Sequence, residues 1–443
     1  MVYIFVSGGS FGIEEMVSSS GPGLTLLLLV TLPFFWAMPM ALAACELGSA
    51  MPNTGFYDWT KRALGPFWGF LSAWWWTLAT LVDTSLYVVL AANYLQGYVG
   101  FNQNLFYFAC WLVIGAFAVI NILGLRLVAL SSVIFSILII SPFLVLIIVG
   151  LANWQFDPFH PIVPPGQNLM GGDGALILGL SVGLWMYSGY ESLSTLSGEM
   201  SNSERIIPKA LMLALPFVAL MYVLPTLASL AAFGQWDRFG LAGTGDSVSF
   251  IDIGRTLGGT ALGHALLASA LLGNLSLYID YMGSCARPIY ALADDKLFPE
   301  FLLRVSPRFG TPVAAIVTVA AINCVLIIGP FQTLVIIDVM LMVAAYALIL
   351  ISLVRLRVME PQLLRPYRIP LGTAGLSLMI ATPLGLIVLV IYLAGIDRSL
   401  IFFGTNELRI FGWSIGWNAA LSFLGLATGP FAYYFFTRVK KPA

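Results

Sequence analysis

Charged residues are scarce in this chain: Asp, Glu, Lys and Arg make up 9% of its 443 residues, whereas 59% are hydrophobic. A soluble domain of this size does not need so much apolar sequence, and no polar stretch is long enough to form a separate soluble domain. These two absences exclude an ordinary soluble protein. The composition therefore predicts an all-α polytopic membrane protein, with the lipid bilayer as its main partner.

Metal-ligating and redox residues are equally scarce. The chain has two His and four Cys, and the cysteines (Cys45, Cys110, Cys285 and Cys324) are scattered within or beside apolar runs. This spacing indicates neither a metal site nor a disulfide framework. The Gly-rich segments lie within apolar runs and lack the strand-turn-helix context of a nucleotide site. We therefore expect no enzyme activity, no cofactor, no metal and no nucleic-acid partner.

Long apolar runs fill most of the sequence. A run of about 17 to 25 apolar residues is long enough to cross a bilayer as a helix. Only six residues precede Ser7 in the first run, so either its first half is short or a longer start has been lost. We predict twelve spans, at about residues 2–20, 24–50, 67–97, 105–123, 128–150, 173–197, 209–233, 261–285, 312–329, 331–354, 373–394 and 410–436.

Basic residues are divided unevenly between the predicted loops. With the N-terminus inside, sixteen of the twenty Lys and Arg residues fall in inner connections, and the outer ones hold only Arg238, Arg255, Arg398 and Arg409. Cytoplasmic loops carry the excess of Lys and Arg in membrane proteins. The sequence thus predicts that both termini are cytoplasmic, and we expect the protein in the plasma membrane.

Two of the apolar runs are interrupted by glycine and end in a carboxylate. The first interruption is SGGSFGIEE, from Ser7 to Glu15, and the second is YSGYE, from Tyr187 to Glu191. Glycine is a poor helix former, and unwound backbone at membrane depth is tolerated only where protein or a water-filled cavity covers it. Two broken segments in two hydrophobic spans are typical of a secondary transporter whose substrate site lies near the middle of the membrane.

Several acids lie inside predicted spans, where matching Lys and Arg residues are almost absent. An ionised carboxylate without a partner in a low dielectric costs several kcal/mol, so it must be protonated, hydrated or paired with something that the sequence does not supply. A cationic substrate or a transported proton would fill that role. The candidates are Glu14, Glu15, Glu46, Asp83, Glu191, Glu199, Asp280 and Asp338.

Glu191 and Asp83 have the most suggestive surroundings. Glu191 lies in the second break, and Asp83 is followed four residues later by Tyr87, on the same helical face. A carboxylate beside a phenol can bind an amine. The alternatives are a structural cap for Glu191 and an intrahelical polar cluster for Asp83.

The other acids have stronger alternatives. Glu14 and Glu15 open the outer half of the first helix, where the helix dipole alone favours negative charge. Glu46, Glu199 and Asp338 are better explained as structural or gating residues. The predicted substrate site comprises the two breaks, the remaining acids and their neighbouring tyrosines: Gly8, Gly9, Ser10, Phe11, Gly12, Glu14, Glu15, Asp83, Tyr87, Tyr187, Ser188, Gly189, Tyr190, Glu191, Tyr278, Asp280 and Tyr281.

Several stretches resemble the motifs of a known superfamily. They are SGGSFGIEE from Ser7, ACELGSAMPNTGFYDW from Ala44, VDTSLY from Val82, GYESLSTLSGEMSNSERIIPKAL from Gly189, ALADDKLFPEFL from Ala291 and RPYRIPLGTAG from Arg365. Throughout its predicted spans the chain resembles the amino acid-polyamine-organocation (APC) superfamily. Within it, the chain looks most like the polyamine:proton symporters of plants and trypanosomatid parasites.

The resemblance implies a LeuT-type fold of two inverted five-helix repeats followed by two accessory helices. The transporter core would occupy residues 1–355, with repeats at about 1–150 and 173–355, and the accessory helices would occupy residues 356–443. The broken first and sixth helices would then face each other across the midplane. Glu191 would take the acidic position of the polyamine branch, and Tyr190 the position of an aromatic lid.

The resemblance also implies uptake of putrescine or spermidine by alternating access, driven by a proton gradient. Ammonium groups would pair with Glu191 and Asp83, and alkyl carbons would pack on Tyr87, Tyr187 and Tyr190. Protonation of one buried acid would help release the substrate. Two alternatives remain: a cationic or neutral amino acid carrier of the same superfamily, and a substrate-sensing receptor on a transporter scaffold.

Overall fold

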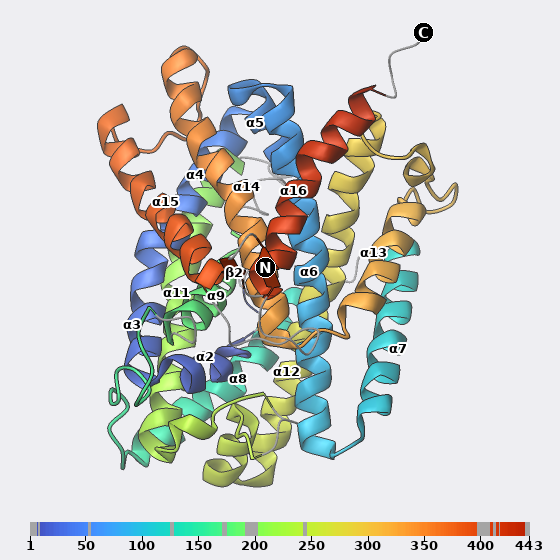
Figure 1. Ribbon diagram of the computed structural model, residues 1–443. Helices are drawn as coiled ribbons and strands as arrows, with labels where there is room; N and C mark the ends of the chain where they lie inside the picture. Colours follow the sequence, from blue (N-terminus) through green and yellow to red (C-terminus); the bar gives the residue numbers. More distant parts are fainter. Residues whose placement is uncertain are drawn as a thin grey trace.

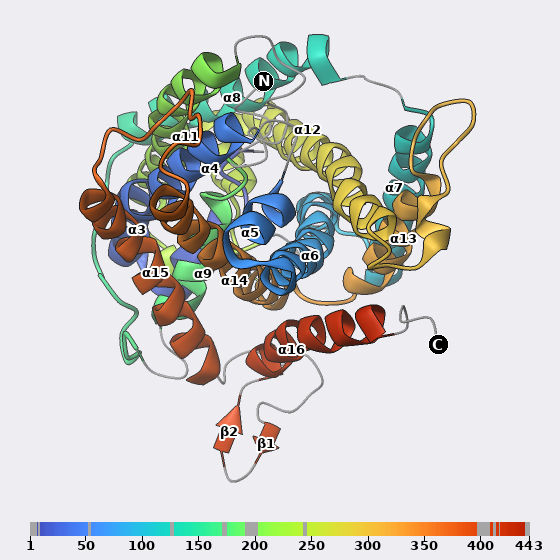
Figure 2. The ribbon, with the colours of Figure 1, turned by 90° about the horizontal axis from the view of Figure 1, so that it is seen from above.

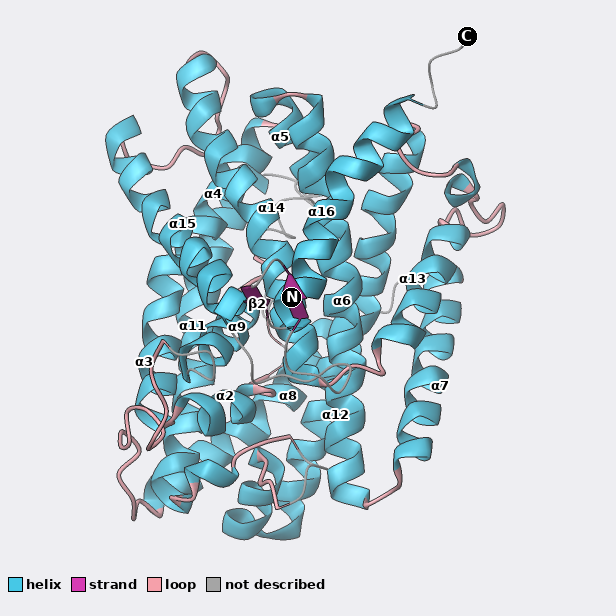
Figure 3. Cartoon of the chain, in the orientation of Figure 1, coloured by secondary structure: helices cyan, strands magenta, loops and turns pink. Residues whose placement is uncertain are grey.

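The computed structural model is almost entirely helical (Figure 3). It describes residues 7, 9–51, 55–124, 128–170, 175–190, 203–241, 246–396, 408–410, 413–415 and 417–438. The long helices run side by side as one bundle, which Figure 1 shows from the side and Figure 2 from the end. The helices are α2 (Ile13–Ser20), α3 (Pro22–Leu32), η1 (Pro33–Ala37), α4 (Met38–Ala50), α5 (Phe56–Leu64), α6 (Pro66–Val99), α7 (Gln103–Ile122), α8 (Val128–Ala152), α9 (Ala175–Met186), α11 (Ser203–Phe233), η3 (Trp236–Arg238), α12 (Phe250–Asp294), η4 (Glu300–Leu303), α13 (Val313–Leu326), α14 (Phe331–Met359), α15 (Thr373–Ile396) and α16 (Trp417–Arg438).

The apolar helices fit a membrane protein that crosses the bilayer several times. A described helix overlaps each of the twelve predicted spans. Eight helices of the described part are long and apolar enough to cross a membrane, and α9 and α13 are shorter apolar helices. On the outer face of α7, Phe108 is 58% and Leu112 is 63% exposed. Large side chains of this kind would be unfavourable in water, so this face is suited to lipid.

Helices α6 and α14 form the interior of the bundle. They pack along each other, and α6 also packs against α5 and α12. Figure 2 shows α7, α13 and α16 at the periphery. Because α6 and α14 are covered by other helices for most of their length, polar side chains on them face protein or a cavity rather than lipid.

Two elements differ from the predicted spans. Helix α12 is much longer than the predicted span 261–285, and it joins two helical pieces across a kink at Gly259, where φ is 75°. Before α16, Leu408–Ile410 (β1) and Trp413–Ile415 (β2) pair as an antiparallel hairpin, so the last helix begins at residue 417 and not near 410. Aromatic and β-branched residues favour this extended pairing, and the short hairpin lies beside an otherwise helical fold.

Candidate functional site

The first break leads into α2 through two glycines with left-handed backbone. Gly9 has a φ of 105° and Gly12 a φ of 92°, values that other residues rarely adopt. A Cβ atom at Gly12 would lie 3.2 Å from the ring of Phe331. The hydroxyl of Ser10 donates a hydrogen bond to the carbonyl of Met221, which fastens the break to α11.

The second break begins where α9 ends, at Met186, as the glycine pattern predicts. The Tyr187 hydroxyl donates a 2.7 Å hydrogen bond to the carbonyl of Leu29 in α3. The Ser188 hydroxyl accepts a 3.3 Å bond from the indole of Trp36, which belongs to the π-helical turn η1. Turns of this kind are frequent at functional sites. Gly189 has a φ of 94°, so the chain leaves α9 in a conformation suited to glycine.

A pocket lies between the two breaks and helices α6, α11, α12 and α14. The space between these elements, together with the open solvent at its mouth, is about 610 Å³. None of its described lining residues is Lys, Arg or His. The lining residues are Ser7, Gly9, Phe11, Trp76, Ala79, Thr80, Asp83, Tyr87, Trp185, Met186, Ser188, Gly189, Tyr222, Asn274, Leu277, Tyr281, Asp338, Met342 and Tyr346.

Asp83 is held in the pocket wall by donors from two helices. Its Oδ1 accepts a 2.7 Å hydrogen bond from the indole of Trp185 in α9, and its Oδ2 accepts a 3.3 Å bond from the Tyr87 hydroxyl. The Tyr87 ring also packs against Trp185 and Tyr281, with centroids 5.9 and 5.5 Å away. A carboxylate framed by aromatic rings is suited to an ammonium group. The Tyr87 bond equally fits the intrahelical cluster that the sequence left as an alternative.

Asp338 also lines this pocket, although the sequence favours a structural or gating role for it. It lies in α14, and its side chain is only 2% exposed. The carboxylate forms no hydrogen bond or ion pair within the described part of the chain. The pocket wall therefore carries two acids, from α6 and α14.

The structure places Glu14 and Glu15 away from the pocket lining. The buried Glu14 carboxylate accepts hydrogen bonds from the Tyr94 hydroxyl (2.8 Å) and from the backbone amides of Gly12 (3.0 Å) and Phe250 (3.2 Å). Glu15 accepts a 2.9 Å bond from the Leu241 amide and another from the Gln332 side chain. These contacts tie α2 to α6, α12 and α14. They support the structural alternative, and substrate contact by these two acids stays a prediction.

The other predicted site residues divide into three groups. Gly9, Phe11, Asp83, Tyr87, Ser188, Gly189 and Tyr281 line the pocket. Gly8 and Glu191 lie outside the described residues. The described residues that do not reach the lining are Ser10, Gly12, Glu14, Glu15, Tyr187, Tyr190, Tyr278 and Asp280.

Tyr278 and Asp280 lie on other faces of α12. The Tyr278 hydroxyl accepts a 3.4 Å hydrogen bond from the side chain of Asn323 in α13, which explains its burial in the bundle. Asp280 is half-buried and has no hydrogen-bond partner among the residues that the structure describes. Tyr281, the next residue after Asp280, is the member of this group that lines the pocket.

Helical spacing would have found several lining residues that the sequence analysis missed. Trp76 and Thr80 precede Asp83 by seven and three residues and so share its face of α6. Met342 and Tyr346 follow Asp338 at intervals of four residues along α14. Trp185, in contrast, reaches Asp83 across 102 positions of sequence, so no local pattern points to the contact.

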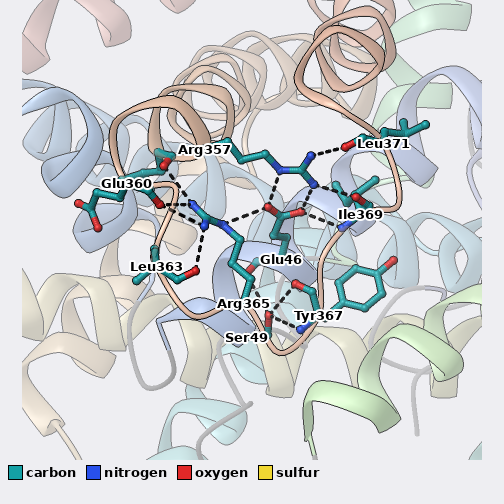
Figure 4. Close-up of polar contacts among 10 residues, drawn as sticks. Glu46, Ser49, Arg357, Glu360, Leu363, Arg365, Tyr367, Ile369 and Leu371 are labelled. Atoms are coloured by element: carbon teal, nitrogen blue, oxygen red, sulfur yellow. Dashed lines mark hydrogen bonds and ion pairs between the residues drawn. The ribbon is translucent and has the colours of Figure 1, made fainter.

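A separate ionic cluster lies outside the pocket, at the ends of α4 and α14 (Figure 4). The buried Glu46 carboxylate accepts a 2.7 Å hydrogen bond from Nε of Arg357, a second from its Nη2, and a 3.3 Å contact from Arg365. The amide of Ile369 donates to the same carboxylate at 2.9 Å, and Arg357 also donates to the carbonyl of Leu371 at 2.6 Å. This cluster gives Glu46 the structural role that the sequence favours.

Beside this cluster, Arg62 of α5 forms an exposed pair with Glu360. Its Nε and Nη2 atoms lie 3.0 and 2.6 Å from the two carboxylate oxygens. The hydrogen bond from the guanidinium lowers the pKa of the Glu360 carboxyl below its usual value. Glu360 follows the last residue of α14, so this pair lies outside the apolar part of that helix.

The fold and the site together define a multi-pass helical membrane protein with a pocket that the two glycine-containing breaks help to line. The amino acid permease family matches residues 1–426, and the chain belongs to this family. It is similar to the polyamine transporter PUT1 of Oryza sativa subsp. japonica, with 32% identity over 91% of this chain and 74% of the relative. It is also 30% identical to the polyamine transporter RMV1 of Arabidopsis thaliana, over 90% of this chain and 80% of the relative. A probable polyamine transporter of Arabidopsis thaliana is 33% identical, over 89% of this chain and 78% of the relative.

Proposed function

We propose that the protein imports polyamines, such as putrescine and spermidine, by alternating access. The observation that carries this proposal is the pocket wall: buried acids and aromatic rings line it, and none of its described lining residues is basic. A cation is therefore the ligand that the lining complements. The names of the similar plant proteins, which describe them as polyamine transporters, support the same substrate class.

Asp83 is the acid best placed to bind an ammonium group, because Trp185 and Tyr87 fix both of its oxygens. The alkyl chain would pack on Trp76, Tyr87 and Tyr346, which line the same pocket. We propose Glu191 as a further substrate contact, since its neighbour Tyr190 belongs to the second break. Amines of this kind are largely protonated at neutral pH, so ion pairing is available throughout the cycle.

Two backbone amides of the first break already have hydrogen-bond partners, which weighs against the amino acid alternative. The Gly12 amide already donates to Tyr94 at 2.9 Å and to Glu14 at 3.0 Å. The Gly9 amide donates to the Ser7 hydroxyl at 3.3 Å. A carboxylate would have to displace these partners, and it would also lie in the same pocket as Asp83.

We propose a LeuT-type arrangement for the whole chain. Twelve membrane helices would comprise two inverted five-helix repeats, at about residues 1–150 and 173–355, and two accessory helices within 356–443. The helical elements that overlap the predicted spans, and the positions of the two breaks, support this arrangement. Both termini would be cytoplasmic, and the membrane would be the plasma membrane.

Proton coupling is the final part of this proposal. In symport the proton and the substrate must move inward together, so the acid that carries the proton would differ from the acid that pairs with the ammonium group. A buried acid without a basic partner is suited to carry a proton, because protonation removes its charge in the low dielectric. Binding of both on the outside and release of both on the inside would then couple substrate uptake to the proton gradient.

The test is uptake of radiolabelled putrescine into proteoliposomes under an inward proton gradient. Unlabelled spermidine should compete, while arginine and leucine should compete weakly. Better competition by arginine or leucine would favour the amino acid alternative. Specific putrescine binding without accumulation would favour the substrate-sensing alternative.

A further inference from the structure

Asp338 is a buried acid, and the residues described around it do not compensate the charge of its carboxylate. It is 2% exposed, and it faces the pocket from α14, one of the two central helices. Within the described part of the chain, no residue donates a hydrogen bond to its carboxylate or forms an ion pair with it. Asp83, in the same wall, has both Trp185 and Tyr87 as donors. An acid that is buried in a membrane protein, faces a cavity and has no described partner indicates a ligand that supplies positive charge.

The two acids together set the charge that the ligand must carry. Asp83 and Asp338 share one mostly apolar and aromatic enclosure, and none of its described lining residues is basic. Two carboxylates in one low-dielectric enclosure repel each other and lose hydration. A ligand with one positive charge would neutralise one carboxylate. The other would still be ionised without a partner and without its hydration. A ligand with two separated ammonium groups would satisfy both.

We propose that Asp338 binds the second ammonium group of a bound polyamine while Asp83 binds the first. The pair would thereby select molecules with at least two cationic groups over monoamines of the same length. Rings contributed by Trp76 and Tyr346, whose centroids lie 5.6 Å apart, give the connecting alkyl chain an apolar surface. This inference rests on the proposed function and adds to it the basis of substrate selection.

The experiment compares putrescine with n-butylamine, which has the same four-carbon chain and one amine. Proteoliposomes loaded with unlabelled putrescine exchange it for labelled putrescine without a proton gradient, and each amine is titrated as inhibitor of this exchange. Asp338→Asn should reduce the preference for putrescine over n-butylamine about 10- to 100-fold, because one charged contact is lost. The affinity for n-butylamine should change little. Asp252→Asn, which alters an acid outside the pocket lining, should leave the preference intact.

Three results separate this inference from the proposed function. An Asp338→Asn protein that exchanges putrescine with its preference unchanged would overturn the inference and leave polyamine transport standing. Unchanged preference together with loss of proton-driven accumulation would also overturn it, because Asp338 would then act on protons and not on the amine. Failure of the unaltered protein to exchange putrescine would instead overturn the proposed function.

A second variant keeps the inference testable if Asp338→Asn does not fold. Asp338→Glu retains the charge and moves it about one methylene further into the pocket. It should keep the preference for diamines over n-butylamine and shift the optimum from putrescine toward the shorter 1,3-diaminopropane. An unchanged dependence on diamine length would count against a direct contact between Asp338 and the substrate.

Discussion

Asp83 accepts its shorter hydrogen bond from the indole of Trp185, which belongs to another helix. A substitution can remove this donor and still keep an aromatic ring in the pocket wall. Trp185→Phe keeps an aromatic ring beside Tyr87 but deletes the Nε1 donor 2.7 Å from the carboxylate. Hydrogen bonds to charged groups contribute about 1.5–3 kcal/mol, and water in the pocket would replace part of that. We expect the KM for putrescine to rise about tenfold in uptake assays.

Trp111→Phe is the matched control for this change. The Trp111 indole donates a 3.2 Å hydrogen bond to the carbonyl of Cys324, on the exposed side of α7. Its loss removes the same chemical group outside the pocket, so the KM should stay near that of the unaltered protein. Equal losses in both variants would show that the Trp185 effect is a general loss of packing.

Single residues of the site were predictable where helical spacing brings them together. Tyr87 follows Asp83 by one helical turn, and their hydrogen bond is local. The contact between Asp83 and Trp185 depends on how α9 packs against α6, and the sequence contains no signal for that packing. For the same reason Asp338 could be recognised as a buried acid but not as a member of the same pocket wall.

The ionic cluster around Glu46 joins separate elements, and its loss should be measurable as a loss of stability. Glu46 of α4 and Arg357 of α14 are distant in sequence but paired in the structure (Figure 4). Glu46→Gln would leave the buried Arg357 guanidinium without its carboxylate partner. Removing one partner of a buried pair typically costs about 3–5 kcal/mol. We expect a clear fall in the thermal unfolding midpoint of the detergent-solubilised protein.

Glu360→Gln provides the comparison within the same region. The Arg62–Glu360 pair has good geometry but is partly exposed, with side-chain accessibilities of 44% and 33%. Exposed pairs contribute about 0–1 kcal/mol, so the midpoint should move little. A fall as large as that of Glu46→Gln would mean that burial does not account for the difference between the two pairs.

The elements themselves were largely readable from hydropathy, because each apolar run must satisfy its backbone internally in lipid. Each predicted run therefore overlaps a described helix. The extension of α12 through the kink at Gly259 was missed because its first part is polar enough to resemble a loop. The hairpin of β1 and β2 was missed because its residues are as apolar as those of a helix.

The orientation of the whole molecule can be tested from both sides of the membrane. Asp237 lies in a predicted outer connection and Arg308 in a predicted inner one, and both side chains are exposed. In a background without the four native cysteines, Asp237→Cys should react with a membrane-impermeant maleimide on intact cells. Arg308→Cys should react only after the membrane is opened. The reverse pattern would contradict cytoplasmic termini.

The acids of the pocket wall are fixed to the protein, and this has an electrical consequence. When a bound polyamine leaves the pocket, Asp83 and Asp338 stay behind, so the polyamine would carry its own charge across the membrane. Two charges would move with putrescine, and each symported proton would add one more. Every elementary charge gains about 2.3 kcal/mol in a potential of 100 mV. A negative interior voltage would therefore accumulate polyamine even at equal pH on the two sides, and each turnover would register as an inward current.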